Sequence, residues 1–454
     1  MQADMTNPKK THLDASYDPK LANLWPIAVP LGGAMLSQAL IGLVDTALVG
    51  QLGGLALASV SIGSYLVFIL VAIVTGFGTG WHSLVSQHAQ SHSGLLLSGL
   101  VYGILFALGL AASAAYFFAD IINVFVLDDR INSLAAYYGQ TRLWGLPAIV
   151  ISIAARIYWS EQGAPWQYTK VILLVHLANA GISFCLIYGV GGLPAMGAVG
   201  AGVGTSIALW LGVFLQLTLV LGRHVKGVHL YPPLSLKNAR LLLGFSWAPM
   251  LQQLMFALHL AIFLWIVSQL GASVMAASFA VLNVGLLMVL PAVGLGQAAL
   301  TLVGTTITTQ DPTHAIKWSK LILRTGVLTA SVVALFVGFM SPWLAPLLLV
   351  NRELQLLMAA ALPWYAAAMI LETAVIILSR LVLVTGLRKT VLMVVSFSQW
   401  LLFLPSLAWL TPSYGFMAVW WLHVGYRVVA VLLLWLVWRR STNGLTMWSK
   451  LLLK

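Results

Sequence analysis

Pro30-LGGAMLSQALIGLV-Asp45-TALVGQLGG decides the fold of this chain, because the stretch is apolar for long enough to cross a bilayer and Asp45 is its only charge. A helix that crosses the hydrocarbon core needs about 20 predominantly apolar residues. A carboxylate at such a depth is costly, and residues of this kind usually have a function. Asp45 is therefore predicted to bind a proton or another cation.

The composition agrees with a membrane protein. Hydrophobic residues make up 60% of the 454 residues and charged residues 7%, too little polar surface to cover a soluble globule. The single cysteine, Cys185, lies in an apolar run and predicts packing, not a disulfide framework or a cysteine metal site. The first 20 residues are polar and lack the features of a secretory signal, so we expect a cytoplasmic tail.

Apolar stretches long enough to span a bilayer recur along the whole chain. Twelve are found, and because twelve is even, both termini are expected on the same side of the membrane. The predicted spans are 24–49, 55–81, 94–119, 133–158, 167–190, 197–222, 238–268, 274–300, 315–341, 354–384, 389–411 and 414–438.

The basic residues orient these spans, since cytoplasmic loops retain an excess of Lys and Arg. One side collects most of them, including the linker 223–240, whereas the other side holds only Arg130, Arg142 and Arg352. Both termini are therefore predicted to be cytoplasmic, in a chain of the cell inner (cytoplasmic) membrane. The same asymmetry explains the net charge of +12 without a nucleic-acid partner.

An internal repeat sets the architecture. Gln51-Leu52-Gly53 recurs as Gln269-Leu270-Gly271, Gly76-x-Gly78 as Gly294-x-Gly296, and Pro194-x-x-Gly197 as Pro412-x-x-Gly415, each 218 residues later; Pro30 matches Pro249 at 219. Six spans per half predict an all-α membrane protein of two six-helix bundles, related by a pseudo-twofold along the membrane normal. The expected parts are a tail at 1–23, an N-lobe at 24–230, a C-lobe at 231–439 and a tail at 440–454.

Several motifs carry a resemblance to a known family. They are the early proline of the first span, Asp45-T-A-L-V-Gly50-x-x-Gly53, Gly76-F-G-T-Gly80, and Gly197-A-V-Gly200-A-G-V-Gly204-Thr205. The chain resembles the multidrug and toxic compound extrusion (MATE) transporters along nearly its whole length. It is most similar to the DinF-type branch, because the NorM-type branch typically carries an acid in the seventh helix, where Phe256-Ala-Leu-His259 has none.

The candidate coupling site consists of Asp45, Asn179, Ser183 and Thr205. Counting residues from the span ends places all four in the outer half of the N-lobe, so a shared hydrogen-bond network is expected. The resemblance implies that this corner binds the coupling proton beside the drug site. Family members often carry a second acid or an asparagine where Ser183 stands, so we expect one proton per cycle. Sodium is the alternative, because these side-chain oxygens can also coordinate it.

The expected mechanism is competition for Asp45 between a proton and a positively charged drug. A proton arriving from outside would neutralise Asp45, release its hydrogen bonds and let the first helix bend at Pro26 or Pro30, where the backbone ladder is already interrupted. In the alternative interpretation, Asp45 only joins helices through Asn179. No cofactor or metal is expected, and the partners are small organic cations or toxic metabolites and membrane lipid, with the chain as a monomer.

A substrate cavity is predicted between the lobes. Aromatic faces suit flat cations and methionines suit varied ones, although packing is the alternative for each residue. The candidates are Met35, Gln38, Trp210, Met255 and His259.

Glu372 and Arg427 are the clearest charges inside the C-lobe spans, and their depths agree. They are interpreted as a structural ion pair, with a second cation or substrate site as the alternative. His423, the repeat equivalent of Thr205, could join either arrangement.

Two further charged motifs receive plainer interpretations. Arg156 and Glu161 are expected to be an interfacial pair or solvated charges near the end of the fourth span. The run of His82, His88 and His92 has no accompanying acid or cysteine, so a metal site is not predicted.

Other function classes fit less well. A lipid-linked oligosaccharide flippase of the same superfamily should have an interior rich in Arg and Lys. A major-facilitator carrier should have a Gly-Asp-Arg-rich motif between spans 2 and 3. An intramembrane enzyme should show a nucleophile with a base or a metal motif, and none appears. A passive channel would not require Asp45.

Overall fold

The structure is a computed structural model that describes residues 18–88, 92–125, 129–221, 235–308, 312–348 and 351–452. Within these ranges the elements are helices, without strands. The side chain of Gln38 and the expected lobe boundary at residue 231 lie outside the described part.

The first half supplies six of the predicted spans. Its fourth span is broken into two helices around Gly145, and Pro147 stands in the first turn of the second one, where its missing N–H is tolerated. The helices are α1 (Leu21–Gly50), α2 (Gly54–Ser86), α3 (His92–Phe125), α4 (Asp129–Leu143), α5 (Leu146–Glu161), α6 (Pro165–Tyr188), the short η2 (Val190–Gly192) and α7 (Ala198–Leu221).

The second half supplies the other six. Its last two spans lie in one continuous run that turns back at Gly415, whose φ of 62° favours glycine. The elements are α8 (Leu236–Ser268), α9 (Ala272–Thr308), α10 (Pro312–Leu348), α11 (Arg352–Val384), α12 (Arg388–Ser396), η3 (Phe397–Phe403) and α13 (Leu404–Leu452). The predicted all-α, twelve-span architecture is therefore confirmed, although α13 continues as helix past the predicted end of its span.

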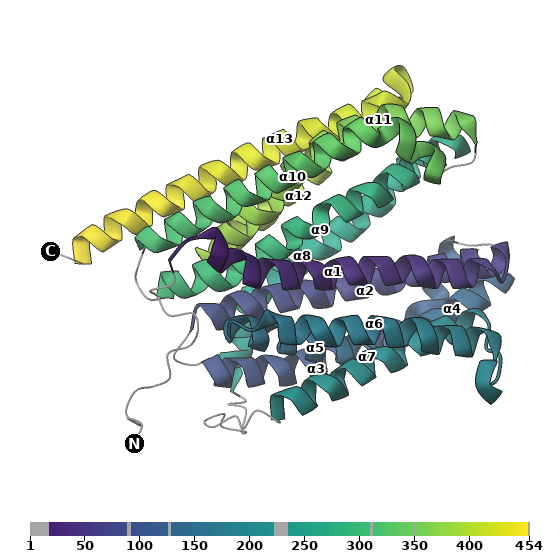
Figure 1. Cartoon of the computed structure of the whole chain (residues 1–454), viewed down its shortest axis with the longest axis horizontal. Coiled ribbons are helices and arrows are strands. Elements are labelled where there is room, and N and C mark those ends of the chain that lie inside the picture. Colours follow the sequence, from purple (N-terminus) through teal and green to yellow (C-terminus); the bar gives the residue numbers. More distant parts are fainter. Residues whose placement is uncertain are drawn as a thin grey trace.

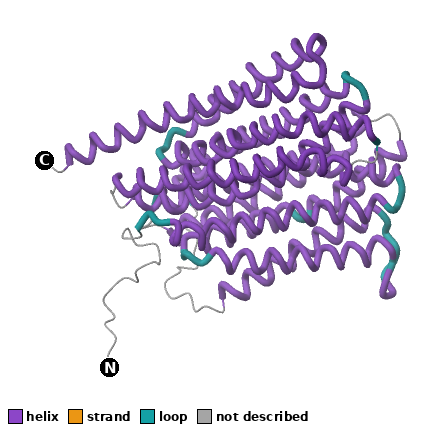
Figure 2. Tube along the Cα trace, turned by 45° about the horizontal axis from the view of Figure 1, so that its top comes forward, coloured by secondary structure: helices purple, strands orange, loops and turns teal. Residues whose placement is uncertain are grey.

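The beginning of α1 and the end of α13 lie at the same end of the helix bundle (Figures 1 and 2). We call this end the terminal side and the other end the opposite side. In Figure 1, the ribbons α10, α11 and α13 diverge from α1 and α2 with increasing distance from the terminal side.

Two glycines mark close contacts between the halves. A Cβ at Gly76 would lie 2.5 Å from Met250 Cα of α8, and one at Gly294 would lie 2.7 Å from the carbonyl oxygen of Ala28 on α1. Gly76 and Gly294 are repeat equivalents, and each meets the first helix of the other half. The contacts therefore follow the pseudo-twofold relation that the repeat predicts.

The hydrophobic core that joins the halves lies on the terminal side. Its fully buried members include Leu24 and Leu31 of α1, Leu300 of α9 and Trp318 of α10, together with Trp159 of α5 at 1% exposure. On the opposite side, the described residues form separate clusters. One hydrophobic cluster lies in the first half and includes Val49 and Tyr138. Another lies in the second half. The two halves therefore share a hydrophobic core on the terminal side, whereas each half has its own cluster on the opposite side.

Gly76→Ala tests the contact between α2 and α8. The added methyl group would meet backbone atoms of Pro249 and Met250 within 2.6 Å, so the helices must separate. We expect a loss of about 1–3 kcal/mol, as in other overpacked cores, measured by thermal unfolding in detergent. Gly109→Ala on α3 is the matched control, because nothing lies within 4 Å of its Cβ. Equal effects of the two substitutions would contradict the contact.

Candidate functional site

Asp45 lies on α1, and Asn179 of α6 is its main partner. The Asn179 amide nitrogen donates to both carboxylate oxygens, at 3.3 and 3.1 Å. Ser183, one turn further along α6, donates to the side-chain oxygen Oδ1 of Asn179 at 3.3 Å. Asn179 and Ser183 are 3% and 0% exposed, whereas Asp45 is partly buried. The structure thus brings together three of the four predicted residues through hydrogen bonds.

Thr205 of α7 completes the group. Its hydroxyl donates to the Ala201 carbonyl oxygen at 2.8 Å and also lies beside the Asp45 carboxyl group. Gly204 lets α7 approach α6 closely, because a Cβ there would lie 2.6 Å from the Ser183 hydroxyl oxygen. Since the one hydroxyl proton of Thr205 is already used, its oxygen can accept a hydrogen bond from a protonated Asp45.

Arg142 is a charged neighbour of Asp45 that sequence reasoning misplaced. It was counted among the outer basic residues, but it lies in the last turn of α4, well inside the fourth span, and attracts the Asp45 carboxylate electrostatically. The predicted span 133–158 already contained it. The site therefore holds a positive charge as well as a negative one.

A line of polar contacts joins α1 to α6 between Asp45 and the terminal side. Ser37 and His176 share a hydrogen bond, and Thr169 donates to the Pro30 carbonyl oxygen at 2.8 Å. Sequence reasoning missed Thr169 and His176. The spacing of seven, from 30 to 37 and from 169 to 176, was the available signal, because residues seven apart share a helix face.

The predicted substrate-cavity residues are dispersed. Met35 and Met255 are partly buried on α1 and α8. Trp210, 43% exposed, donates from its indole nitrogen to the Trp144 carbonyl oxygen at 3.0 Å, within the first half. His259 is 6% exposed and packs against Phe403 with ring centroids 5.3 Å apart. This burial in the aromatic core favours a packing role for His259, because substrate could not reach the ring.

Glu372 and Arg427 form the expected pair between α11 and α13. Arg427 Nε donates to Glu372 Oε2 at 2.6 Å, and Nη1 donates to the His423 carbonyl oxygen at 3.0 Å. The guanidinium also lies 4.6 Å from the centre of the Tyr426 ring. A positive charge with an acid, a carbonyl and an aromatic face is well compensated, which favours the structural interpretation of the pair.

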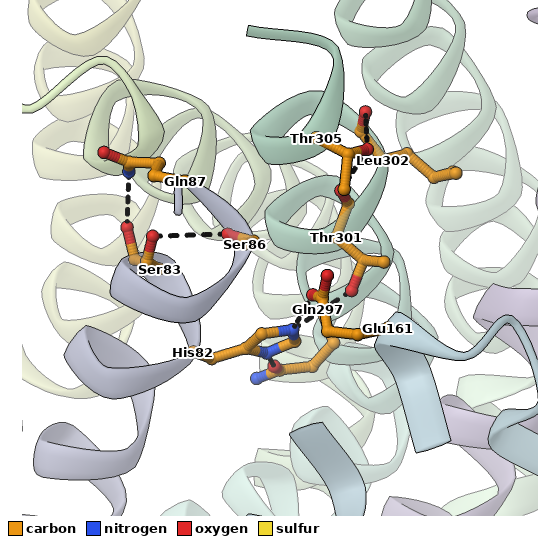
Figure 3. A network of polar contacts seen from close by, with 9 residues as sticks. All are labelled: His82, Ser83, Ser86, Gln87, Glu161, Gln297, Thr301, Leu302 and Thr305. Atoms are coloured by element: carbon orange, nitrogen blue, oxygen red, sulfur yellow. Dashed lines mark hydrogen bonds and ion pairs between the residues drawn. The ribbon is translucent and has the colours of Figure 1, made fainter. Parts of the chain in front are cut away.

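A buried polar network joins the two halves on the terminal side (Figure 3). His82 of α2 is its centre: Nε2 lies 3.1 Å from Glu161 Oε1 of α5 and 3.0 Å from Thr301 Oγ1 of α9. Its Nδ1 lies 3.3 Å from Gln297 Oε1, also on α9. The network therefore contributes polar contacts between the halves next to the shared hydrophobic core.

This network corrects the expectation for Arg156 and Glu161. Glu161 is 5% exposed and paired with His82, and Arg156 is 6% exposed, so neither is solvated and they are not each other's partners. His88 is not part of the His82 network, and its Nδ1 contacts the Leu84 carbonyl oxygen at 2.9 Å. Sequence spacing could not show these partners, because they come from helices far apart in the chain.

Removing His82 should open the terminal side more easily. In His82→Ala, Glu161, Thr301 and Gln297 lose a buried partner, which costs about 1–3 kcal/mol for each group left unsatisfied. The readout is the rate at which a thiol reagent labels the side chain introduced by Ala299→Cys, at a fully buried core position. The native thiol is removed by Cys185→Ser. We expect faster labelling by a thiol reagent in His82→Ala, and a smaller effect in His82→Gln, which keeps hydrogen-bonding atoms. Unchanged labelling would rule out a role in closure.

Comparisons with known proteins agree with this fold. The family model MatE matches residues 30–188. A protein from Burkholderia vietnamiensis named multidrug resistance protein NorM is 26% identical over 437 residues, which cover 90% of this chain and 92% of the relative. A probable NorM of Mannheimia succiniciproducens is 25% identical over 414 residues, 87% of each chain.

A solved structure shares the fold. It is described as the outward-facing conformation of a multidrug resistance MATE family transporter of the MOP superfamily, and it matches with a TM-score of 0.88, 18% identity and coverage of 96% of this chain and 99% of its own. The greater similarity to the DinF-type branch stays a prediction. The family model over residues 30–188, the relatives along most of the chain and the shared twelve-span fold make this chain similar to the multi-pass membrane transporters of the MATE family.

Proposed function

We propose that this protein is a secondary active multidrug exporter of the bacterial inner membrane, which exchanges a proton for an organic cation by alternating access. The observation that carries the proposal is the Asp45 carboxylate, held in a membrane span by the Asn179 amide. The multidrug resistance names of the relatives support the substrate class.

The geometry suits competition at Asp45. A partly buried carboxylate is stabilised by a proton, by a positive ligand or by a hydrogen-bond donor, and one donor, Asn179, is already in place. Arg142 adds a fixed positive charge, which limits the site to one further cation at a time. Protonation would replace the acceptor role of Asp45 towards Asn179 with a donor role, for which Thr205 offers an acceptor oxygen.

The packing suits alternating access. With the terminal side towards the cytoplasm, the shared core and the His82 network close the cytoplasmic end, and the halves have separate cores at the other end. A drug would be released outwards from this arrangement. The return step requires the α1–α9 and α2–α8 contacts to rearrange, and the prolines Pro26 and Pro30 give α1 two positions where its hydrogen-bond ladder is already incomplete.

Sodium is the second candidate for the coupling ion. Carboxylate, amide and hydroxyl oxygens from Asp45, Asn179, Ser183 and Thr205 lie together in one region, and Na⁺ accepts ligands of these types. The fixed charge of Arg142 does not choose between the two ions, because Asp45 neutralised by a proton or by Na⁺ leaves the same net charge beside the guanidinium. The single carboxylate of the group favours the proton, since it offers no cage of two acids for a metal cation.

The test is ethidium transport by the purified protein in liposomes under separate gradients. We expect transport with a pH gradient in sodium-free buffer, and none with a sodium gradient at equal pH. Transport that requires sodium would replace the proton by sodium in the proposal. Transport that follows neither gradient would overturn coupled export.

A further inference from the structure

A hydrogen bond between Ser37 of α1 and Nδ1 of His176 on α6 lies on the terminal side of Asp45. His176 stands three residues before Asn179, the partner of Asp45, so one helical turn separates the two side chains of α6. It also stands eleven residues after the start of α6 at Pro165, or about 17 Å at 1.5 Å per residue. The ring therefore lies near the middle of its span, one turn inward of the coupling site.

A second contact holds α1 and α6 in the same register. Thr169 donates to the Pro30 carbonyl oxygen at 2.8 Å, and each of these residues stands seven positions before a member of the Ser37–His176 pair. Helical side chains lean towards the beginning of their helix. Asn179, with the carboxyl group that it binds, therefore leans over the turn of α6 that carries His176.

Packing does not explain this ring as it explains two other histidines of the spans. His259 and His423 are buried, with ring centroids 5.3 and 4.5 Å from that of Phe403. His176 is partly buried. Within the part of the chain that the structure describes, it makes one hydrogen bond, through Nδ1, and no ring contact. Its Nε2 is therefore available to exchange a proton.

Few titratable groups surround His176. The helix α6 packs mainly against α1, α5 and α7. Asp45 is the titratable group of α1, and the sequence of α7 has none. The others on α5 and α6 are Arg156, Tyr158, Glu161, Tyr168, Lys170, Cys185 and Tyr188. The first five stand nearer the terminal side than His176, and the last two stand beyond Asn179. His176 is thus the first titratable group inward of Asp45 on these helices.

We propose that His176 carries the coupling proton from Asp45 towards the terminal side, an inference that rests on the proposed proton exchange. Across one helical turn, a bridging water can pass the proton. The O–H bond of the protonated Asp45 carboxyl group breaks and an N–H bond forms at His176 Nε2, which leaves a carboxylate and an imidazolium. When the terminal side opens, the imidazolium releases the proton to water and becomes neutral again. Ser37 holds the ring through Nδ1 during both steps.

Two substitutions separate proton transfer from the joining of helices. His176→Asn places an amide atom near the position of Nδ1, so it can keep the hydrogen bond to Ser37, but it cannot carry a proton. Ser37→Ala removes the same hydrogen bond and keeps the imidazole. A proton carrier makes the first substitution the more harmful one, whereas a purely structural contact makes the second one more harmful.

Both variants and the wild type are reconstituted in liposomes, and two activities are measured with ethidium. Net transport driven by a pH gradient needs a proton to be released inwards in every cycle, whereas exchange of labelled for unlabelled ethidium at equal pH does not. We expect His176→Asn to lower net transport by about tenfold or more and to leave exchange near the wild-type rate. Ser37→Ala should lower net transport less than His176→Asn does.

The wild type is measured first, because a lack of pH-driven transport there would overturn the proton exchange and the relay together. With an active wild type, equal net transport in His176→Asn would overturn the relay and leave the proposed exporter intact. A greater loss in Ser37→Ala would also overturn the relay. If His176→Asn loses exchange as well, His176→Gln, whose longer amide reaches towards the Nε2 position, takes its place. Loss of exchange in both variants would assign the ring to the α1–α6 contact alone.

Discussion

Asp45→Asn is expected to abolish ethidium transport driven by a pH gradient, down to the level of liposomes without protein. Asparagine has nearly the same shape and can still contact Asn179, so the α1–α6 contact can survive. It cannot take up and release a proton, and it offers no negative charge to a cationic drug. The effect should therefore appear in transport and not in folding, which thermal unfolding of the same samples would check.

Asp120→Asn is the matched control. Asp120 lies on α3, five residues before its end at Phe125, as Asp45 lies five residues before Gly50, and it is exposed. Both substitutions remove one carboxylate from the first half at a similar depth on the opposite side. Transport should remain in Asp120→Asn. If it remains in Asp45→Asn as well, Asp45 only joins helices and the coupling group must be sought elsewhere.

Glu372→Ala should destabilise the second half by about 3–5 kcal/mol, because it leaves the Arg427 guanidinium buried without its acid. The side chains of Arg427 and Glu372 are 7% and 19% exposed, so water can replace little of the lost interaction. Thermal or denaturant unfolding in detergent measures the loss.

The double substitution Glu372→Gln with Arg427→Met separates structure from transport. It removes both charges together and should recover most of the stability, since an ion pair can often be replaced by uncharged groups of similar volume. If transport also recovers, the pair is structural. A stable double variant without transport would instead favour the second-site interpretation of Glu372 and Arg427.

The architecture could be predicted well because its signals are local or periodic. Span length follows from apolar runs, and the two-half arrangement follows from motifs repeated 218 residues apart. The Asp45–Asn179 contact was also within reach, because depth can be counted along each helix. The pairing of Arg427 with Glu372 could be predicted for the same reason, because the two charges occur at matching depths in otherwise apolar spans.

The remaining site residues could not be predicted because depth alone does not specify which helices are neighbours. Arg156 and Glu161 are five apart on one helix, yet Glu161 pairs with His82 of α2, and the Nε and Nη2 atoms of Arg156 are buried without a hydrogen-bond partner. Arg142 was counted among the outer basic residues although the predicted span 133–158 contained it, and its nearness to Asp45 depends on how distant helices pack. In each case the deciding information is the packing of distant helices.

The glycine contact at position 76 lies closer to one end of α2 than to the other. Gly76 lies 10 residues from the end of α2 at Ser86 and 22 residues from its beginning at Gly54, or about 15 and 33 Å at 1.5 Å per residue. If the halves rock about this crossing, a small separation of the short arms on the terminal side produces roughly twice the displacement of the long arms. In such a motion, a narrow opening on one face of the membrane accompanies a wide closure on the other face.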